Sequence, residues 1–137
     1  MGAKYTQALP HQFCIVEKNH HDSKQDTGRH GEELAGEYLM ANGYQVLARN
    51  WRYQRSEIDL IAAKDDCIHF IEVKTLHGNQ FSMPEYKVNK AKLRMLKAGA
   101  QGYLLQHPEW KWIQFDIVAI TLFPHQPPDI FLIADIS

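Results

Sequence analysis

Asp59, Glu72 and Lys74 are the residues whose types and spacing could carry out chemistry. Asp59 lies in a short apolar run, residues 58–63, and the other two lie in a second run, residues 67–75. Both runs are typical of β-strands, and the polar residues between them predict a turn. Two carboxylates that share a divalent cation, with a lysine nearby, form a set that can hydrolyse a phosphodiester bond.

The length of the turn decides whether the two carboxylates meet. If Asp65 and Asp66 alone form the turn, the antiparallel register places Asp59 directly opposite Glu72, with Cβ atoms roughly 5 Å apart. Lys74 then shares their face of the sheet, because side chains alternate along a strand. A three-residue turn would move Asp59 to the other face.

Carboxylates that face each other repel, so a purely structural sheet gains nothing from this pair. A divalent cation between Asp59 and Glu72 would remove the repulsion. Mg²⁺ suits the site because it needs only one or two protein carboxylates, and Mn²⁺ is an alternative. Lys74 would then contact the scissile phosphate or help to orient and deprotonate the attacking water. The alternative is that Glu72 and Lys74 are a solvated ion pair on an ordinary strand.

Composition describes an ordinary globular chain. The 137 residues are 45% hydrophobic and 23% charged, with a formal net charge of −1. They suffice for one domain with its own core. Because the net charge is close to zero, any binding of nucleic acid must use local basic patches. Cys14 and Cys67 match no metal-ligand spacing, and no apolar stretch approaches membrane-spanning length. Two lone cysteines and no signal peptide indicate a cytoplasmic protein.

The first predicted helix carries a third carboxylate, Glu32, that could belong to the site. Residues 1–27 show little periodicity, and we expect a poorly ordered N-terminal extension before a domain that spans residues 28–137. A helix is predicted from Asp26 or Thr27 to residue 41, and Asn42-Gly43 would end it. Glu32 falls on the apolar stripe of this helix, where a carboxylate is unusual. It is either part of the site or a charge that complements the helix dipole.

Basic residues gather in two further places. Arg52 lies between Trp51 and Tyr53 in the segment that follows a predicted strand, residues 44–48, and arginine among aromatic residues can bind phosphates and stack on bases. A long helix is predicted over residues 89–106. Its first half carries several basic residues and no acidic one, which works against the helix dipole unless phosphates bind there. The residues that we assign to phosphate contact on this helix are Lys90, Lys92 and Arg94.

The remaining pattern completes an α/β domain. Residues 112–122 form a strongly apolar strand that contains Asp116 and should lie in the middle of a sheet. Residues 130–134 should form a last strand at its edge. The order helix, strand, hairpin, helix, strand, strand predicts a mixed β-sheet flanked by helices.

Taken together, the motifs resemble the YraN family of small predicted endonucleases. The resemblance covers roughly residues 28–121. The residues that carry it are Gly31-Glu32, Ala35, Tyr38-Leu39, Gly43-Tyr44, Asn50, Arg52, Glu57-Ile58-Asp59-Leu60-Ile61, Ile71-Glu72-Val73-Lys74, Val88, Lys92, Leu96, Ala100, Tyr103-Leu104 and Phe115-Asp116-Ile117-Val118. Asp59 followed by Glu-Val-Lys also resembles the core motif of the PD-(D/E)XK nucleases, although Ile58 stands where those enzymes carry proline.

Three further residues depart from the YraN pattern. Ser56 replaces a glycine, and Thr75 and Gln114 each replace an arginine. None of these changes removes an expected ligand, although the two lost arginines would weaken phosphate binding.

The resemblance implies a restriction-endonuclease-like fold, related in its core to archaeal Holliday-junction resolvases. By that likeness Glu32, Asp59 and Glu72 would hold the metal, the carbonyl of Val73 could complete the site, and Lys74 would be catalytic. The expected function is Mg²⁺-dependent hydrolysis of DNA, including branched or repair intermediates. The alternative is a non-catalytic nucleic-acid-binding or scaffold module with the same fold. RNA as a substrate and assembly as a homodimer stay open.

Overall fold

The computed structural model describes residues 4–7, 24–78 and 89–137. Two helices and six strands make up this part of the chain. In chain order they are β1 (Lys4–Gln7), α1 (Lys24–Ala41), β2 (Gln45–Tyr53), β3 (Ser56–Lys64), β4 (Cys67–His77), α2 (Lys90–Gln106), β5 (Trp112–Leu122) and β6 (Asp129–Ala134).

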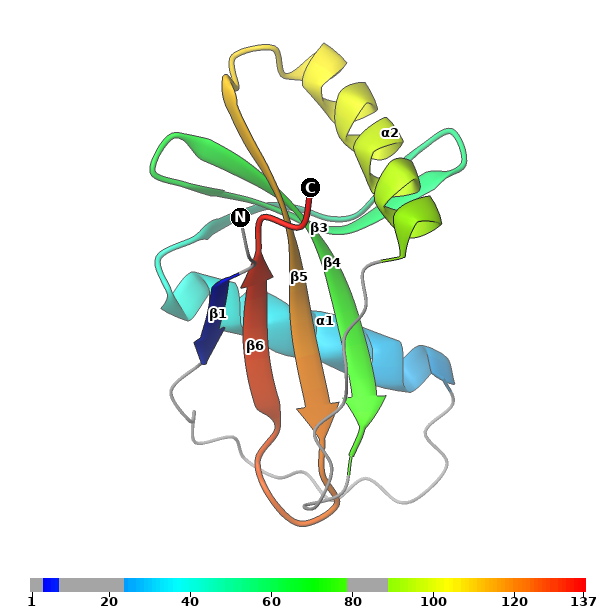
Figure 1. Cartoon of the computed structure of the whole chain (residues 1–137), viewed down its shortest axis with the longest axis vertical. Coiled ribbons are helices and arrows are strands. Elements are labelled where there is room, and N and C mark those ends of the chain that lie inside the picture. Colours follow the sequence, from blue (N-terminus) through cyan, green and yellow to red (C-terminus); the bar gives the residue numbers. More distant parts are fainter. Residues whose placement is uncertain (1–3, 8–23, 79–88) are drawn as a thin grey trace.

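The described strands form one mixed sheet in the order β1-β6-β5-β4-β3-β2. The pair β4 and β5 is parallel, and the other neighbouring pairs are antiparallel. Parallel strands require a crossover connection, and α2 lies in the segment that joins β4 to β5. Figure 1 shows α1 crossing behind β4, β5 and β6. The helix α2 lies in the upper right of the view and contacts β3 more than any other strand. The predicted α/β class with a mixed sheet and helices is confirmed.

The strand β4 separates two hydrophobic cores, because consecutive side chains point to opposite faces. Ile71 belongs to the core under α1, where Tyr38 and Leu39 are fully buried. Phe70, its neighbour, belongs to the core under α2, together with Leu96. Each helix therefore covers its own face of the sheet.

The ends of α1 and α2 follow the local sequence. Gly43 adopts a φ of 88° after the last turn of α1, and the backbone N–H of Tyr44 donates to the carbonyl of Leu39 at 3.0 Å. This left-handed stop is the one that Asn42-Gly43 predicts. At the start of α2, the Asn89 side chain accepts hydrogen bonds from the backbone N–H groups of Ala91 and Lys92. It is an N-cap that fixes where the helix begins.

The turn between β3 and β4 has two residues, as predicted. Asp65 and Asp66 both adopt positive φ, 48° and 62°, which is the backbone of the tight turn that matches the twist of a hairpin. The observed pairs run from Lys64 opposite Cys67 to Leu60 opposite Ile71. This is the register on which the opposition of Asp59 and Glu72 depends.

The N-terminal part differs from expectation in one respect. Lys4–Gln7 form β1, which pairs with β6, so β6 does not lie at the edge of the sheet as the sequence predicted. An isolated run of four residues carries no detectable strand periodicity, and its pairing partner lies more than 120 residues away. Residues 8–23 lie outside the described residues, so the expectation of a poorly ordered extension stays a prediction.

Candidate active site

Asp59 and Glu72 lie where the hairpin of β3 and β4 begins to separate. The last residue pair of the antiparallel ladder is Leu60 with Ile71, and continuing the same register by one step would place Asp59 opposite Glu72. Glu72 projects to the face that carries α2, since Phe70 belongs to the core under that helix and Lys92 of α2 contacts Glu72. The hairpin register is the one that the prediction requires, and Asp59 and Glu72 are close enough to interact by charge. Their direct opposition stays a prediction.

The backbone of β4 anchors the Asp59 carboxylate. Its Oδ2 accepts a hydrogen bond from the backbone N–H of Val73 at 2.8 Å. The Asp59 side chain is thus the acceptor for the Val73 N–H, at the point where the backbone pairing of β3 with β4 stops. The bond fixes the direction of the carboxylate and engages one of its two oxygens.

Burial and neighbouring charge hold the pKa of Asp59 at about 6, against an ordinary value of 3.8. Burial is the largest cause, and the carboxylates of Glu32 and Glu72 add to it by repulsion. The hydrogen bond from Val73 and the charge of Lys92 act in the opposite direction. Asp59 therefore lies within the electrostatic reach of two other carboxylates and one ammonium group, which is the pattern of functional sites.

Glu32 reaches this region because α1 approaches β4 closely. Gly31, the preceding residue, packs so tightly against the Thr75 side chain that a Cβ atom would overlap with the Thr75 hydroxyl. Glycine is thus required at this crossing of helix and strand. The half-buried Glu32 side chain lies on the stripe that the sequence indicated. Thr75, which departs from the family pattern, forms part of this contact.

Lys92 extends from the first turn of α2 to Glu72. Its Nζ lies 3.6 Å from Glu72 Oε1, and the side chain of Glu72 is only 13% exposed while that of Lys92 is 55% exposed. We expected Lys92 to contact phosphate, and the structure adds a carboxylate partner. The sequence contains a signal for this inward direction of Lys92. The residue precedes the buried Leu96 by one helical turn and so falls on the stripe that faces the sheet.

The other basic candidates lie around this cluster. Lys74 is half-buried on β4, two residues beyond Glu72 on the same face. Lys90 and Arg94 are exposed on α2. Lys90 and Arg94 lie one turn apart on the same side of α2, whereas Lys92, two residues from each, points to a different side, toward Glu72. Their roles stay predictions.

Arg52 lies apart from the acidic cluster, on β2. Its side chain is 76% exposed, and its Nη2 lies 3.7 Å from Glu57 Oε1 across the strand pair. The neighbouring Trp51 and Tyr53 are stacked on each other at 5.9 Å, and the ring of Tyr53 packs directly on Gly102 of α2. These aromatic rings therefore join the hairpin to the helix, and the arginine remains accessible.

The described residues include two neighbouring carboxylates that could bind a cation, but no larger group of metal-binding side chains. Among residues 24–78 and 89–137, no three histidine, cysteine, aspartate or glutamate side chains are arranged to hold one metal ion. Asp59 and Glu72 are two hard oxygen donors on neighbouring strands, and Mg²⁺ accepts one or two carboxylates with water as the remaining ligands. The oxygens of Asp59 and Glu72 therefore fit a divalent cation. Glu32 is close enough for its charge to act on Asp59.

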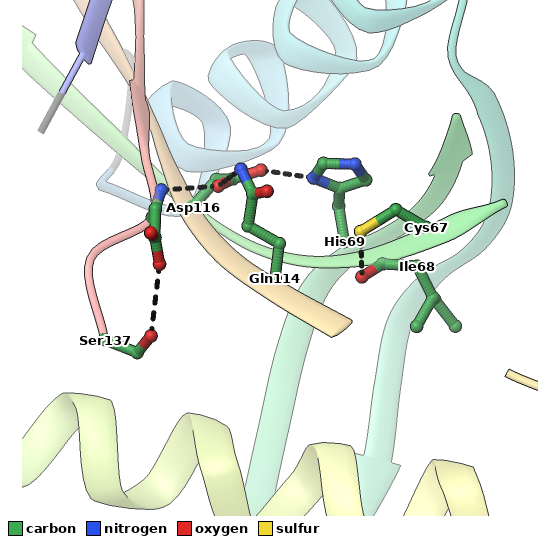
Figure 2. Close-up of polar contacts among 7 residues, drawn as sticks. Cys67, Ile68, His69, Gln114, Asp116 and Ser137 are labelled. Carbon is green, nitrogen blue, oxygen red and sulfur yellow. Dashed lines mark hydrogen bonds and ion pairs between the residues drawn. The ribbon is translucent and has the colours of Figure 1, made fainter. Parts of the chain in front are cut away.

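Asp116 lies in a separate polar network on the opposite face of the sheet. It is fully buried, and it accepts hydrogen bonds from the Gln114 amide and from the backbone N–H of Asp135, each at 2.9 Å. Its other oxygen lies 2.6 Å from Nδ1 of His69 (Figure 2). The bond from Asp135 ties the segment after β6 to β5. The mid-sheet position predicted for Asp116 is confirmed, and the network around it had no sequence signal.

Cys67 lies near this network and is not suited to nucleophilic chemistry. Burial raises the pKa of its thiol, and the charge of Asp116 raises it further. A thiol becomes a nucleophile by losing its proton, so these surroundings keep Cys67 unreactive. Burial also raises the pKa of Tyr44 to about 12, again with a contribution from Asp116.

The fold and the site together define a class: a small α/β domain whose mixed sheet carries an acidic cluster where two strands separate. Neither described helix is long and apolar enough to cross a membrane. A family model, the uncharacterised protein family UPF0102, matches residues 31–120. The chain belongs to this family, which is also called the YraN family.

Relatives in distant bacteria cover most of the domain. A UPF0102 protein of Rhodococcus opacus is 38% identical over 109 residues, which are 79% of this chain and 92% of that protein. One from Syntrophomonas wolfei is 42% identical over 98 residues, or 71% and 85% of the two chains. A third, from Flavobacterium psychrophilum, is 37% identical over 95 residues, or 69% and 80%.

Proposed function

We propose that this protein is a cytoplasmic, Mg²⁺-dependent nuclease with a restriction-endonuclease-like fold, acting on DNA and on branched or repair intermediates in particular. The observation that carries the proposal is the proximity of the Asp59 and Glu72 carboxylates where the β3–β4 ladder ends. Like charges placed together on a sheet cost stability, and a cation removes that cost. Burial and the neighbouring carboxylates raise the pKa of Asp59 to about 6, and a bound cation would lower it again.

The arrangement of elements supports the fold assignment. The chain runs from α1 through the antiparallel strands β2, β3 and β4 to α2 and the parallel strand β5. Acidic residues lie on β3 and β4, and Glu32 lies on the first helix, which supports the proposed likeness to Holliday-junction resolvases.

In this proposal Asp59 and Glu72 bind the cation and Glu32 supports it. When bound, the cation supplies Lewis-acid stabilisation of the phosphate and lowers the pKa of a water. Lys74, on the same face as Glu72, places positive charge where the transition state becomes more negative. Lys90 and Arg94 would follow the phosphate backbone along α2, and Arg52 would contact it from the β2–β3 hairpin.

A cleavage assay over single-stranded, duplex, flap and four-way-junction DNA, with Mg²⁺ or Mn²⁺, tests this proposal. Glu72→Gln should abolish cleavage, because the amide cannot replace an anionic ligand. Glu57→Gln is the matched control: it makes the same change on β3 at an exposed glutamate that faces Arg52, and it should retain cleavage. Cleavage that is insensitive to Glu72→Gln would contradict the assignment of the site.

A second candidate is a non-catalytic nucleic-acid-binding module. The observation that favours it is the lack of a three-ligand metal site among the described residues. It predicts DNA binding without cleavage for every substrate, with binding unchanged by Glu72→Gln.

A further inference from the structure

We propose that Lys92 is the resident counter-ion of the Asp59–Glu72 pair, and that a divalent cation binds by displacing the Lys92 ammonium from Glu72. The inference rests on the proposed function, because it concerns the same carboxylates. It adds a role for a lysine that the sequence assigned to phosphate contact alone.

The position of Lys92 is fixed by the start of α2. Asn89 caps the helix by accepting the backbone N–H of Lys92 at 3.3 Å, which makes Lys92 the third residue of the first turn. Leu96 follows one turn later and is buried against the sheet. The helix therefore directs the Lys92 side chain toward the strands, where its Nζ lies 3.6 Å from Glu72 Oε1.

The helix itself does not favour a lysine in its first turn, where Lys92 lies. A positive charge in the first turn of a helix opposes the helix dipole. Glu72, in contrast, needs a positive partner: its side chain is 13% exposed and it lies close to a second carboxylate on the neighbouring strand. Removing a carboxylate from water without a partner is costly.

The same contact puts Lys92 in competition with a metal. A cation that binds Glu72 approaches the oxygen that Lys92 now contacts, and the two positive charges repel at that distance. Lys92 has a route away, since its side chain is 55% exposed.

Calorimetric titration of the full chain with Mn²⁺, in the absence of DNA, tests this competition. Lys92→Met removes the ammonium and keeps the length of the side chain, so it should bind Mn²⁺ about two- to fivefold more tightly, as expected for a partly exposed ion pair. Lys97→Met is the matched control, because it removes one positive charge from the same helix at a residue that lies over the Phe115 ring. Lys92→Arg should return the affinity to that of the parent.

A metal-free measurement tests the counter-ion separately. In a double-mutant cycle of Lys92→Met and Glu72→Gln, the two changes should be coupled: Lys92→Met should destabilise the parent but not the Glu72→Gln protein. This readout is the melting temperature at pH 8 without divalent cations. Additive effects in the cycle would overturn the inference.

The outcomes separate the inference from the proposed function. If the parent binds Mn²⁺ and Lys92→Met binds it no more tightly than Lys97→Met does, displacement of Lys92 is refuted while the metal site stands. If neither the parent nor Lys92→Met binds Mn²⁺, the proposed function fails and displacement with it. Coupling in the metal-free cycle would then still establish Lys92 as the counter-ion of Glu72.

Discussion

The Asp59 carboxylate and the Val73 backbone N–H form a hydrogen bond of 2.8 Å immediately beyond the last ladder pair of β3 and β4. This bond keeps the two strands joined at the point where their backbones separate. Asp59 therefore has a structural role in addition to any chemical one. Removing the side chain would leave a partly buried donor without its partner, so alanine is a poor probe of this residue.

Asp59→Asn should make the stability of the metal-free protein less dependent on pH. The folded pKa of Asp59 is about 6 and its ordinary value is 3.8, so the folded state binds this proton more tightly. The resulting stabilisation is fully present below pH 3.8 and is lost as the pH rises through 6. We expect a loss of about 1–2 kcal/mol in the parent, after allowing for solvent screening of a half-buried group.

Urea denaturation at pH 4.5 and pH 7.5, with a chelator present, measures this effect. Asparagine keeps an oxygen that can accept from Val73, so the variant should retain the fold. Its own change in stability between the two pH values should be smaller than that of the parent by this amount. Equal pH dependence in both proteins would show that Asp59 titrates normally.

Glu72→Gln and Lys74→Met should separate metal binding from rate. Glu72→Gln should weaken Mg²⁺ binding and abolish cleavage, because it removes an anionic oxygen ligand. Lys74→Met should bind Mg²⁺ at least as well as the parent but cleave about 100-fold or more slowly, as is usual when a group that stabilises transition-state charge is removed. Calorimetry and single-turnover cleavage give the two quantities. Loss of Mg²⁺ binding in Lys74→Met would contradict these roles.

Lys90→Ala and Arg94→Ala should each weaken DNA binding to a similar degree on every sequence. Both side chains are exposed on α2, and each phosphate contact that is lost should lower the salt slope of the binding constant by about one unit. Fluorescence anisotropy over a range of KCl concentrations measures the slope. Lys111→Ala, an exposed lysine outside the helix, is the control. An unchanged slope in the Lys90 and Arg94 variants would assign them to ordinary solvation.

Asp116→Ala should destabilise the protein by about 3–5 kcal/mol, since the buried His69, the Gln114 amide and the Asp135 N–H would all lose their acceptor. The melting temperature should fall by roughly 10 °C or more. Gln114→Ala removes only one of the three partners and should cost about 1 kcal/mol. Similar losses in the two variants would show that Asp116 is not the centre of this network.

The sequence by itself predicted every described element except β1, and it predicted the hairpin register on which the position of the two carboxylates depends. Local chemistry is enough for this: Asp65-Asp66 set a two-residue turn, and the alternation of side chains carries that register along the strands to Asp59 and Glu72. Asn42-Gly43 and Asn89 marked a helix end and a helix start for the same reason, because each cap involves neighbours in the chain.

Only the tertiary structure decided what surrounds those carboxylates. The contact of Lys92 with Glu72 depends on where α2 packs, and the approach of Glu32 depends on Gly31 fitting against Thr75. The pairing of β1 with β6 joins residues from opposite ends of the chain. Such contacts are set by the packing of whole elements across long sequence separations. No period or spacing along the chain records them.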